Sequence, residues 1–334
     1  MNKNLSKNKI AVIGELNVDL IATGLITPPT LNQEILAQDF QVVLGSASAI
    51  FACGIAKLGY PVTFISQVGT DEFGQFCLRS LREAGVSTDR VIENPALKTG
   101  VTISLSTTLD RALVTYLGAI AELKYEHVPP SVFEGHRHLH LTSYFLQHNL
   151  RASFPEIMTD AKQAGLTTSF DPNADPEQEW NDEIWNVFAK TDVLFVNESE
   201  AMQLTRRREL DEALKVLGQS VACVVVKRGR DGAVAIRNGE TASASGFPVE
   251  TVDTTGAGDS FAAGFLHGYL ENHDLRTCLE FGNACGALST LKAGGTANQP
   301  NQTQLSEFLR EQQINSSNHQ GEAFLSHSLT LNGL

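Results

Sequence analysis

The sequence predicts an α/β fold: a three-layer sandwich with a mostly parallel central sheet and a small β-sheet lid. Short apolar runs rich in β-branched residues recur along the chain, with helical patterns between several of them. Strands that alternate with helices are typical of a parallel sheet covered on both faces. Residues 15–45 and 97–117 interrupt this rhythm with patterns typical of exposed antiparallel strands, which predicts the lid.

The central sheet is predicted from five apolar runs, which lie at residues 10–13, 139–142, 167–170, 193–196 and 223–226. Helical patterns lie between these runs, at residues 46–58, 73–84 and 155–164. Each pattern is followed directly by a glycine, at positions 59, 85 and 165. Glycine is the usual residue just past a helix end, so these positions set the predicted helix ends.

The two lid segments have an alternative interpretation as extra edge strands of the main sheet. The second segment resembles a hairpin with its turn near Leu109-Asp110-Arg111. Both segments are flanked by stretches typical of a nucleotide-binding core. We therefore favour a separate accessory sheet.

Bulk composition predicts one domain over residues 1–313 and a polar tail over 314–334. A net charge of -13 argues against nucleic acid and anionic membrane surfaces as partners, because both require basic patches. No apolar stretch approaches the length of a membrane span, and the N-terminal apolar run is too short for a signal peptide. The five cysteines are widely spaced without a CxxC pair, so we expect reduced thiols and a cytoplasmic location.

The run DTTGAGDSFAAGF at residues 253–265 is the most informative stretch. Its small residues Gly256, Ala257 and Gly258 let the backbone approach a ligand closely, and a helix is predicted to follow over residues 260–270. The free amides at a helix start form a site for phosphate. The spacing fits neither a P-loop nor a dinucleotide fingerprint.

Asp259 lies at this predicted anion hole and has two possible roles. It is a helix cap, or it accepts the proton of an attacking hydroxyl while the amides hold the charge of a transferred phosphoryl group. The surrounding sequence favours the second role, because the run resembles the C-terminal signature of the ribokinase-like, or PfkB, family of carbohydrate and nucleoside kinases. Every position of the DTTGAGD core matches, and the resemblance extends over nearly the whole ordered chain.

The resemblance implies an ATP-dependent kinase with Asp259 as catalytic base and the amides of Gly256, Ala257 and Gly258 as anion hole. It implies an acceptor hydroxyl on a small sugar or sugar-like substrate. A nucleoside kinase and a catalytically silent sugar-binding or regulatory module remain alternatives. It also agrees with the lid, through which we expect a homodimer, since an exposed sheet face often needs a partner.

Substrate contacts are implied by GELNVDL, where Asn17 and Asp19 occupy the positions that contact sugar hydroxyls in the family. A turn that uses Asn and Asp for backbone reasons is the alternative. The family's substrate loop has two glycines followed by three residues and an asparagine, whereas this chain has Gly45, Ser46 and then Ile50. Gly45 and Ser46 are carried over as substrate-binding, and Ile50 makes substrate identity uncertain, because isoleucine donates no hydrogen bond.

Nucleotide and magnesium contacts are implied further along the chain. VNESEA resembles the family's NxxE motif, in which Asn197 and Glu200 organise Mg²⁺ and phosphate through water; a helix capping box is the alternative. VVVKRGRDGAV resembles the nucleotide-binding strand and turn, with Lys227 and Gly229 near ATP. Asn283 falls on the helix that flanks the adenine in the family.

A monovalent cation, K⁺, is also implied beside the anion hole. Its site would be formed by Asp253 and the Thr255 carbonyl together with donors from a later loop, Ser289 and Gly294. FDPN at residues 170–173 resembles the same segment of fructokinase-like members, but the arginine that often follows it is absent.

The run GHRHLHL places three histidines on one face of a strand, His136, His138 and His140. No cysteine lies near them in sequence. We expect a partly exposed strand start rather than a metal site.

Overall fold

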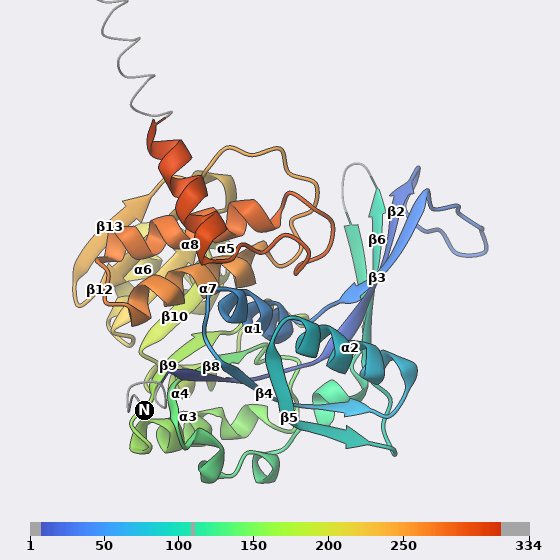
Figure 1. The fold of residues 1–334 in the computed structure, drawn as a ribbon, viewed down its shortest axis with the longest axis horizontal. Helices are drawn as coiled ribbons and strands as arrows, with labels where there is room; N and C mark the ends of the chain where they lie inside the picture. The colour runs from blue at the N-terminus through green and yellow to red at the C-terminus, as the bar shows by residue number, and fades with distance from the viewer. Residues whose placement is uncertain (1–7, 108–110, 315–334) are drawn as a thin grey trace, which may run out of the picture.

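The computed structural model describes residues 8–107 and 111–314 and has the predicted α/β architecture with a separate lid (Figure 1). Two predicted features lie outside the described residues in whole or in part: the hairpin turn at Leu109-Asp110-Arg111 and the polar tail after Ile314. Residues 302–314 are helical, and Leu305 in this segment packs into the core. None of the helices within the described ranges is long and apolar enough to cross a membrane.

The described residues form a main sheet of nine strands. Seven neighbouring strands are parallel to one another, and the two at one edge, β12 and β13, pair antiparallel. All five apolar runs of the sequence are strands of this sheet. In spatial order the strands are β13 (Glu240–Ala244), β12 (Ala233–Arg237), β11 (Cys223–Lys227), β10 (Val193–Asn197), β9 (Thr167–Asp171), β8 (His136–Thr142), β1 (Lys9–Ile13), β4 (Val62–Gly69) and β5 (Val86–Asn94).

Helices cover both faces of the sheet, each over its own buried apolar core (Figure 1). The three predicted helices form within one residue of their predicted ends, because Gly59, Gly85 and Gly165 adopt positive φ just past them. One face carries α1 (Ala47–Lys57), α2 (Glu72–Glu83), α7 (Ala257–Leu270) and α8 (Leu275–Ser289). The other carries α3 (Phe154–Gln163), α4 (Ile184–Phe188), α5 (Glu198–Thr205) and α6 (Leu210–Gly218).

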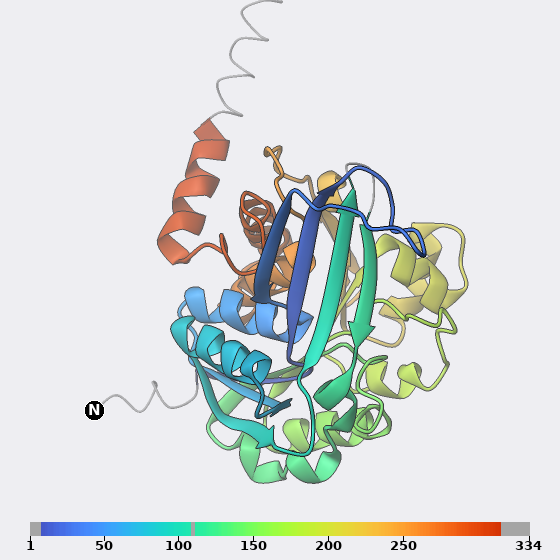
Figure 2. The same cartoon turned by 90° about the vertical axis from the view of Figure 1, so that its right-hand side faces the viewer.

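The lid is a sheet of four strands within the described residues, and it stands in front of the main body in Figure 2. Its order is β3 (Asp39–Leu44), β2 (Asn17–Leu25), β6 (Gly100–Thr107) and β7 (Arg111–Tyr116). The chain passes from β1 of the main sheet to β2 of the lid through residues 14–16, which are buried. This short connection ties the lid to the carboxyl end of β1.

The pleat gives the lid two different faces. Strand register places Val43, Asp19, Thr102 and Thr115 in one row across the sheet, with Val42, Leu20, Ile103 and Val114 in the neighbouring row on the opposite face. Val43 lies close to Gly294 of the main body. We call the face with Asp19 the inner face, and the other the outer face.

Candidate active site

The anion-hole loop and its helix form as the sequence predicts, with the helix beginning three residues earlier, at Ala257. Gly256 precedes the helix with φ 69°, a conformation that favours glycine, so the helix starts directly after it. Asp259 lies in the first turn. The amides of residues 257–259 are therefore among the helix N–H groups without an intrahelical acceptor.

Asp259 has an unusual electrostatic environment. Burial, and next to it the negative charge of Asp171, raise the pKa of Asp259 to about 8, although the ammonium of Lys227 opposes this shift. The negative charges of Glu15 and Glu200 also raise the pKa of Asp259. A carboxyl group with a pKa near the working pH is well matched to general-base chemistry.

The four residues predicted to bind substrate meet between the lid and α1. The Asn17 amide donates to the Asp19 carboxylate over 2.8 Å and to the Thr102 hydroxyl over 3.3 Å. A Cβ added to Gly45 would lie only 2.1 Å from the Asp19 carboxylate, so these side chains rest on the bare glycine backbone. Thr102 and Thr115, whose hydroxyl groups are 3.1 Å apart, extend this polar row across the inner face.

Ser46 occupies the position of the family's second glycine and keeps a glycine-like backbone, with φ 74°. Two hydrogen bonds of its hydroxyl compensate for this conformation. The hydroxyl donates to the Glu15 carbonyl over 2.6 Å and accepts from the Ala49 amide over 3.0 Å, which caps α1. The Glu15 carboxylate is buried and accepts hydrogen bonds from Ser48 and Thr142.

Ile50, which replaces the expected asparagine, is directed away from the polar row of the lid. Its side chain is buried, and its methyl groups lie against the backbone of Gly256 and Gly295. A Cβ added to Gly256 would lie 2.8 Å from the nearer methyl group. Ile50 thus supports the anion-hole loop from beneath.

Asn197 and Glu200 form the capping box that the sequence analysis gave as an alternative. The Asn197 side chain accepts from the Glu200 amide over 2.8 Å, and the Glu200 carboxylate accepts from the Asn197 amide over 2.8 Å. Burial raises the pKa of Glu200, Lys227 opposes this shift, and Asp171 adds to it. A capping role is compatible with water-mediated contact to a cation, because Mg²⁺ needs only one or two carboxylates.

The remaining predicted nucleotide contacts are spread along the edge of the sheet. Lys227 ends β11 and makes an ion pair with Asp171 at 2.6 Å. Gly229 is exposed with open space beside it, whereas both bonds that Asn283 donates go to the carbonyl groups of Ala244 and Ser245. Asn283 therefore holds the end of β13 against α8.

Three of the four predicted monovalent-cation residues come together. The Asp253 carboxylate accepts from the amide and hydroxyl of Thr255, over 2.9 and 2.8 Å, and from the Gly294 amide over 2.9 Å. The Ser289 hydroxyl donates to the Gly286 carbonyl within its own helix. Asp253 therefore joins the loop before α7 to the loop after α8.

The comparisons with known proteins agree with this geometry. The family model described as pfkB family carbohydrate kinase matches residues 7–302. The chain belongs to this family. It is an ATP-dependent carbohydrate kinase, and the kinase relatives below support that activity.

A 2-dehydro-3-deoxygluconokinase of Bacillus subtilis is 31% identical over 82% of this chain and 88% of its own. A fructokinase of Vibrio alginolyticus is 30% identical over 90% of this chain and 99% of its own. Among solved structures, a ribokinase II from E. coli in complex with ATP and Mg²⁺ has a TM-score of 0.82 and 27% identity, covering 91% and 99% of the two chains.

The expectation of a partly exposed strand start is wrong for two of the three histidines. His138 and His140 are fully buried within the kinase core, because β8 lies in the middle of the main sheet. The Ser169 hydroxyl lies 2.7 Å from the Nε2 of His138 and 2.7 Å from the Nδ1 of His140. No cluster of three metal-ligating side chains occurs in residues 8–107 and 111–314.

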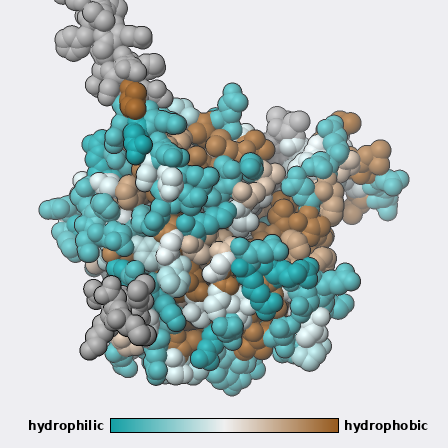
Figure 3. All heavy atoms as spheres, viewed as in Figure 1, coloured by the Kyte–Doolittle hydropathy of each residue, from teal (hydrophilic) through white to brown (hydrophobic). Residues whose placement is uncertain are grey.

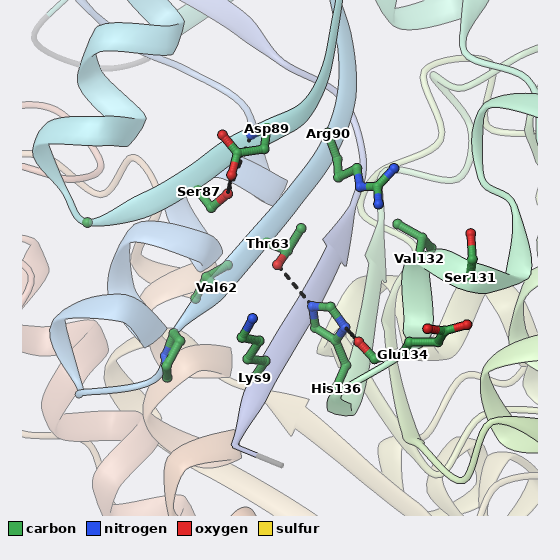
Figure 4. A pocket seen from close by; sticks show the side chains of 12 residues that line it. Lys9, Val62, Thr63, Ser87, Asp89, Arg90, Ser131, Val132, Glu134 and His136 are labelled. Carbon is green, nitrogen blue, oxygen red and sulfur yellow. Dashed lines mark hydrogen bonds between the residues drawn. The ribbon is translucent and has the colours of Figure 1, made fainter. Parts of the chain in front are cut away.

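A cavity of about 440 Å³ lies at the opposite edge of the sheet, at the amino ends of β1, β4, β5 and β8 (Figure 4). Its walls carry both basic and acidic side chains, among them Lys9, Arg90, His136, Asp89 and Glu134. The His136 ring lies 2.9 Å from the Thr63 hydroxyl at its floor. The cavity is separate from the candidate active site.

Four residues of the site were not predicted from the sequence: Asp171, Glu15, Thr102 and Thr115. For Asp171 a signal existed, because it follows an apolar strand run, as Lys227 does, and parallel strands end at the same edge of a sheet. Glu15 likewise lies just past the first strand, after Gly14. For Thr102 and Thr115 there was no comparable signal, since only the register of the lid strands brings them into the row.

Proposed function

We propose that this kinase transfers the terminal phosphoryl group of ATP to a hydroxyl of an uncharged sugar, with Asp259 as general base. The observation that carries the proposal is the position of Asp259 in the first turn of α7, directly after the glycine-rich loop. The acceptor oxygen forms a bond to phosphorus as the bond to ADP breaks, and Asp259 takes the hydroxyl proton. The amides of Gly256, Ala257 and Gly258 stabilise the charge that develops on the phosphoryl oxygens.

Asp19, Asn17, Thr102 and Thr115 form the acceptor side of the proposed site. These side chains offer amide, hydroxyl and carboxylate groups close together, which suits a substrate rich in hydroxyl groups. The Asp19 carboxylate repels a substrate carboxylate, which favours a neutral sugar over a sugar acid. These four residues include no aromatic ring on which a nucleobase stacks, which favours a sugar over a nucleoside.

The buried carboxylate of Glu200 and the amide side chain of Asn197 fit a hard cation that keeps most of its waters. When bound there, Mg²⁺ neutralises charge on the phosphates. Asp253, Thr255 and Gly294 form the proposed K⁺ site, with Ser289 as the remaining predicted donor. The cytoplasmic location, where ATP is abundant, remains a prediction.

The test is an ADP-release assay with Mg·ATP and K⁺ over fructose, ribose, 2-keto-3-deoxygluconate, adenosine and inosine. We expect turnover with a neutral sugar in the wild type and its loss in Asp259→Asn, in which ATP binding is retained. Substantial activity in Asp259→Asn would refute the catalytic role. ATP and sugar binding without ADP release on any acceptor would instead support a silent binding module, and turnover with adenosine or inosine alone would support a nucleoside kinase.

A homodimer through the lid belongs to the same proposal. Exposed apolar side chains lie on the outer face of three lid strands, β3, β6 and β7: Phe40, Val42, Ile103, Val114 and Tyr116. Of these, Phe40 is 58% and Val114 is 58% exposed. Apolar surface is visible over the lid at the right of Figure 3. An exposed apolar sheet face is typical of an interaction surface, and a second copy of the lid is a complementary occupant.

A further inference from the structure

Lys227 and Asp171 make a buried ion pair that bridges two strands. Lys227 ends β11 and Asp171 ends β9, with β10 between them in the sheet. The ammonium lies 2.6 Å from the Asp171 carboxylate, and the two side chains are 14% and 1% exposed. Because neighbouring strands are about 4.8 Å apart, the Lys227 side chain extends across β10 to reach its partner.

The Asp171 carboxylate is itself held on both oxygens. One accepts the Lys227 ammonium, and the other accepts the backbone amide of Asn173 over 3.2 Å. The Asn173 side chain accepts in turn from the amide and hydroxyl of Ser143. The anchor of the lysine is therefore fixed by the turn that follows β9.

The ammonium lies directly behind the anion hole. A Cβ added to Gly258, the last of the three anion-hole residues, would lie 3.3 Å from the Lys227 Nζ. Burial alone lowers the pKa of Lys227, but the carboxylates of Asp171, Glu200 and Asp259 outweigh it and hold the pKa above its ordinary value. His140 on β8 also faces this charge. Lys227 is therefore a permanent cation at neutral pH, surrounded by β8, β9, α5 and α7.

We propose that Lys227 stabilises the transferred phosphoryl group from behind the anion hole and that Asp171 is the positioning residue that holds its ammonium there. The inference rests on the proposed kinase function and adds two roles to it. A long lysine side chain loses rotamer entropy when it is fixed. The ion pair fixes it before substrates arrive, and a preorganised charge needs no rearrangement in the transition state.

The test is a double-mutant cycle of Lys227→Met and Asp171→Asn, assayed for kcat and for both KM values on the accepted sugar. Lys227→Met is expected to lower kcat by about 100-fold, with smaller changes in either KM, because the charge acts mainly in the transition state. Asp171→Asn is expected to lower kcat by about 10-fold, since the lysine remains but loses its anchor. In the Lys227→Met background, Asp171→Asn is expected to have no further effect on kcat on the high-pH plateau, where Asp259 is ionised in every variant, because it acts there only through the lysine.

Lys162→Met is the matched control. The Lys162–Asp192 pair has the same length, 2.6 Å, but lies just before the amino end of β10 at the opposite edge of the sheet. This variant is expected to keep the wild-type kcat. Lys227→Arg, which retains a cation of different shape, is expected to recover part of the activity lost in Lys227→Met.

Loss of Lys227 leaves a buried carboxylate without its partner, so thermal unfolding of every variant is measured and assays are run below the lowest Tm. The double variant removes both charges and keeps the cycle interpretable if Lys227→Met alone is unstable. The proposal is overturned if Asp171→Asn lowers kcat equally in both backgrounds, or if kcat of Lys227→Met stays within about two-fold of wild type. Wild-type turnover on the sugar panel tests the kinase function separately.

Discussion

The imidazole of His140 stacks on the ring of Phe51, with 3.7 Å between the ring centroids and 22° between the planes. His138 precedes it on the same face of β8, and the Ser169 hydroxyl lies within hydrogen-bonding distance of both. Burial lowers the pKa of His138 to about 3 and that of His140 well below its ordinary value. Both imidazoles are therefore neutral in the folded protein.

Neutral buried histidines make the fold sensitive to acid. Their stabilising contribution is fully present above the unfolded pKa of about 6.5 and is lost as pH falls toward the folded value, because the unfolded chain then binds more protons. We expect the Tm of the wild type to fall between pH 6.5 and 4, and that of His138→Gln to fall less over the same interval. His148→Gln, at an exposed position, is the control and should follow the wild type. Equal slopes for all three proteins would contradict this assignment.

The raised pKa of Asp259 predicts the pH dependence of catalysis. A general base works in its deprotonated form, and kcat/KM reports the free enzyme. We expect kcat/KM to rise with pH up to about 8 and then to level off, with about a tenfold change per pH unit well below that value. The measurement is a pH profile from 5.5 to 9.5 in buffers of constant ionic strength. A profile that is flat from pH 6 to 8 would show that Asp259 is already ionised at neutral pH.

The same residue predicts a gain in stability on neutralisation. The pKa of Asp259 in the folded protein lies above its ordinary value of 3.8. The contribution of this carboxyl group to folding stability is therefore fully present below pH 3.8 and is lost as pH rises through about 8. Asp259→Asn does not lose this stability as pH rises, because the amide does not ionise. Without ATP or Mg²⁺, we expect the variant to unfold a few degrees, on the order of 2–4 °C, above the wild type at pH 8. The difference should shrink toward pH 5, and a constant or inverted difference would argue against the raised pKa.

Ser46 offers a test of how the chain tolerates a non-glycine residue at positive φ. Ser46→Ala retains the strained backbone and loses both hydroxyl bonds, so we expect a loss of about 1–3 kcal/mol in the free energy of unfolding. Ser46→Gly loses the same bonds but removes the strain, so it should be more stable than the alanine variant by about 1 kcal/mol. Urea unfolding measures both. An alanine variant as stable as the glycine variant would show that the backbone at this position carries no strain.

The outer face of the lid predicts the oligomeric state. Val114→Glu introduces a charge into the apolar face, and we expect it to convert a dimer into a monomer because a buried charge without a partner is costly. Ile314→Glu is the control, since Ile314 is similarly exposed, at 54%, but lies outside the lid. Sedimentation equilibrium distinguishes the two states. A wild type that is monomeric at micromolar concentration would rule out the lid dimer.

The sequence predicted the parts of the fold that depend on local patterns. Apolar runs and helix-ending glycines such as Gly59 and Gly85 act through neighbouring residues, so the core strands and three helices formed as expected. The burial of His138 and His140 was not predicted, because it depends on strand order. The start of this strand was expected to be partly exposed, whereas β8 lies between β1 and β9.

The candidate site divides in the same way. Gly256 and Asp259 lie within one continuous run, and their arrangement follows from the start of one helix. The partnership of Lys227 with Asp171 joins strands separated by 56 positions in the chain, and no spacing rule specifies it. The position of Ile50 beneath Gly256 also depends on tertiary packing, so the sequence showed the missing asparagine but not what the isoleucine contacts.

The buried connection at residues 14–16 attaches the lid to the main sheet beside the proposed acceptor site. Asn17 is the first residue of β2, Asp19 follows two residues later, and Leu25 ends the strand. At about 3.3 Å per residue, Asp19 lies roughly 7 Å from the start of β2 and Leu25 roughly 26 Å. If the lid turned as a rigid sheet about this connection, its far end would travel about four times as far as Asp19. The polar groups proposed to hold the acceptor would then move least, and the far end of the lid would move most.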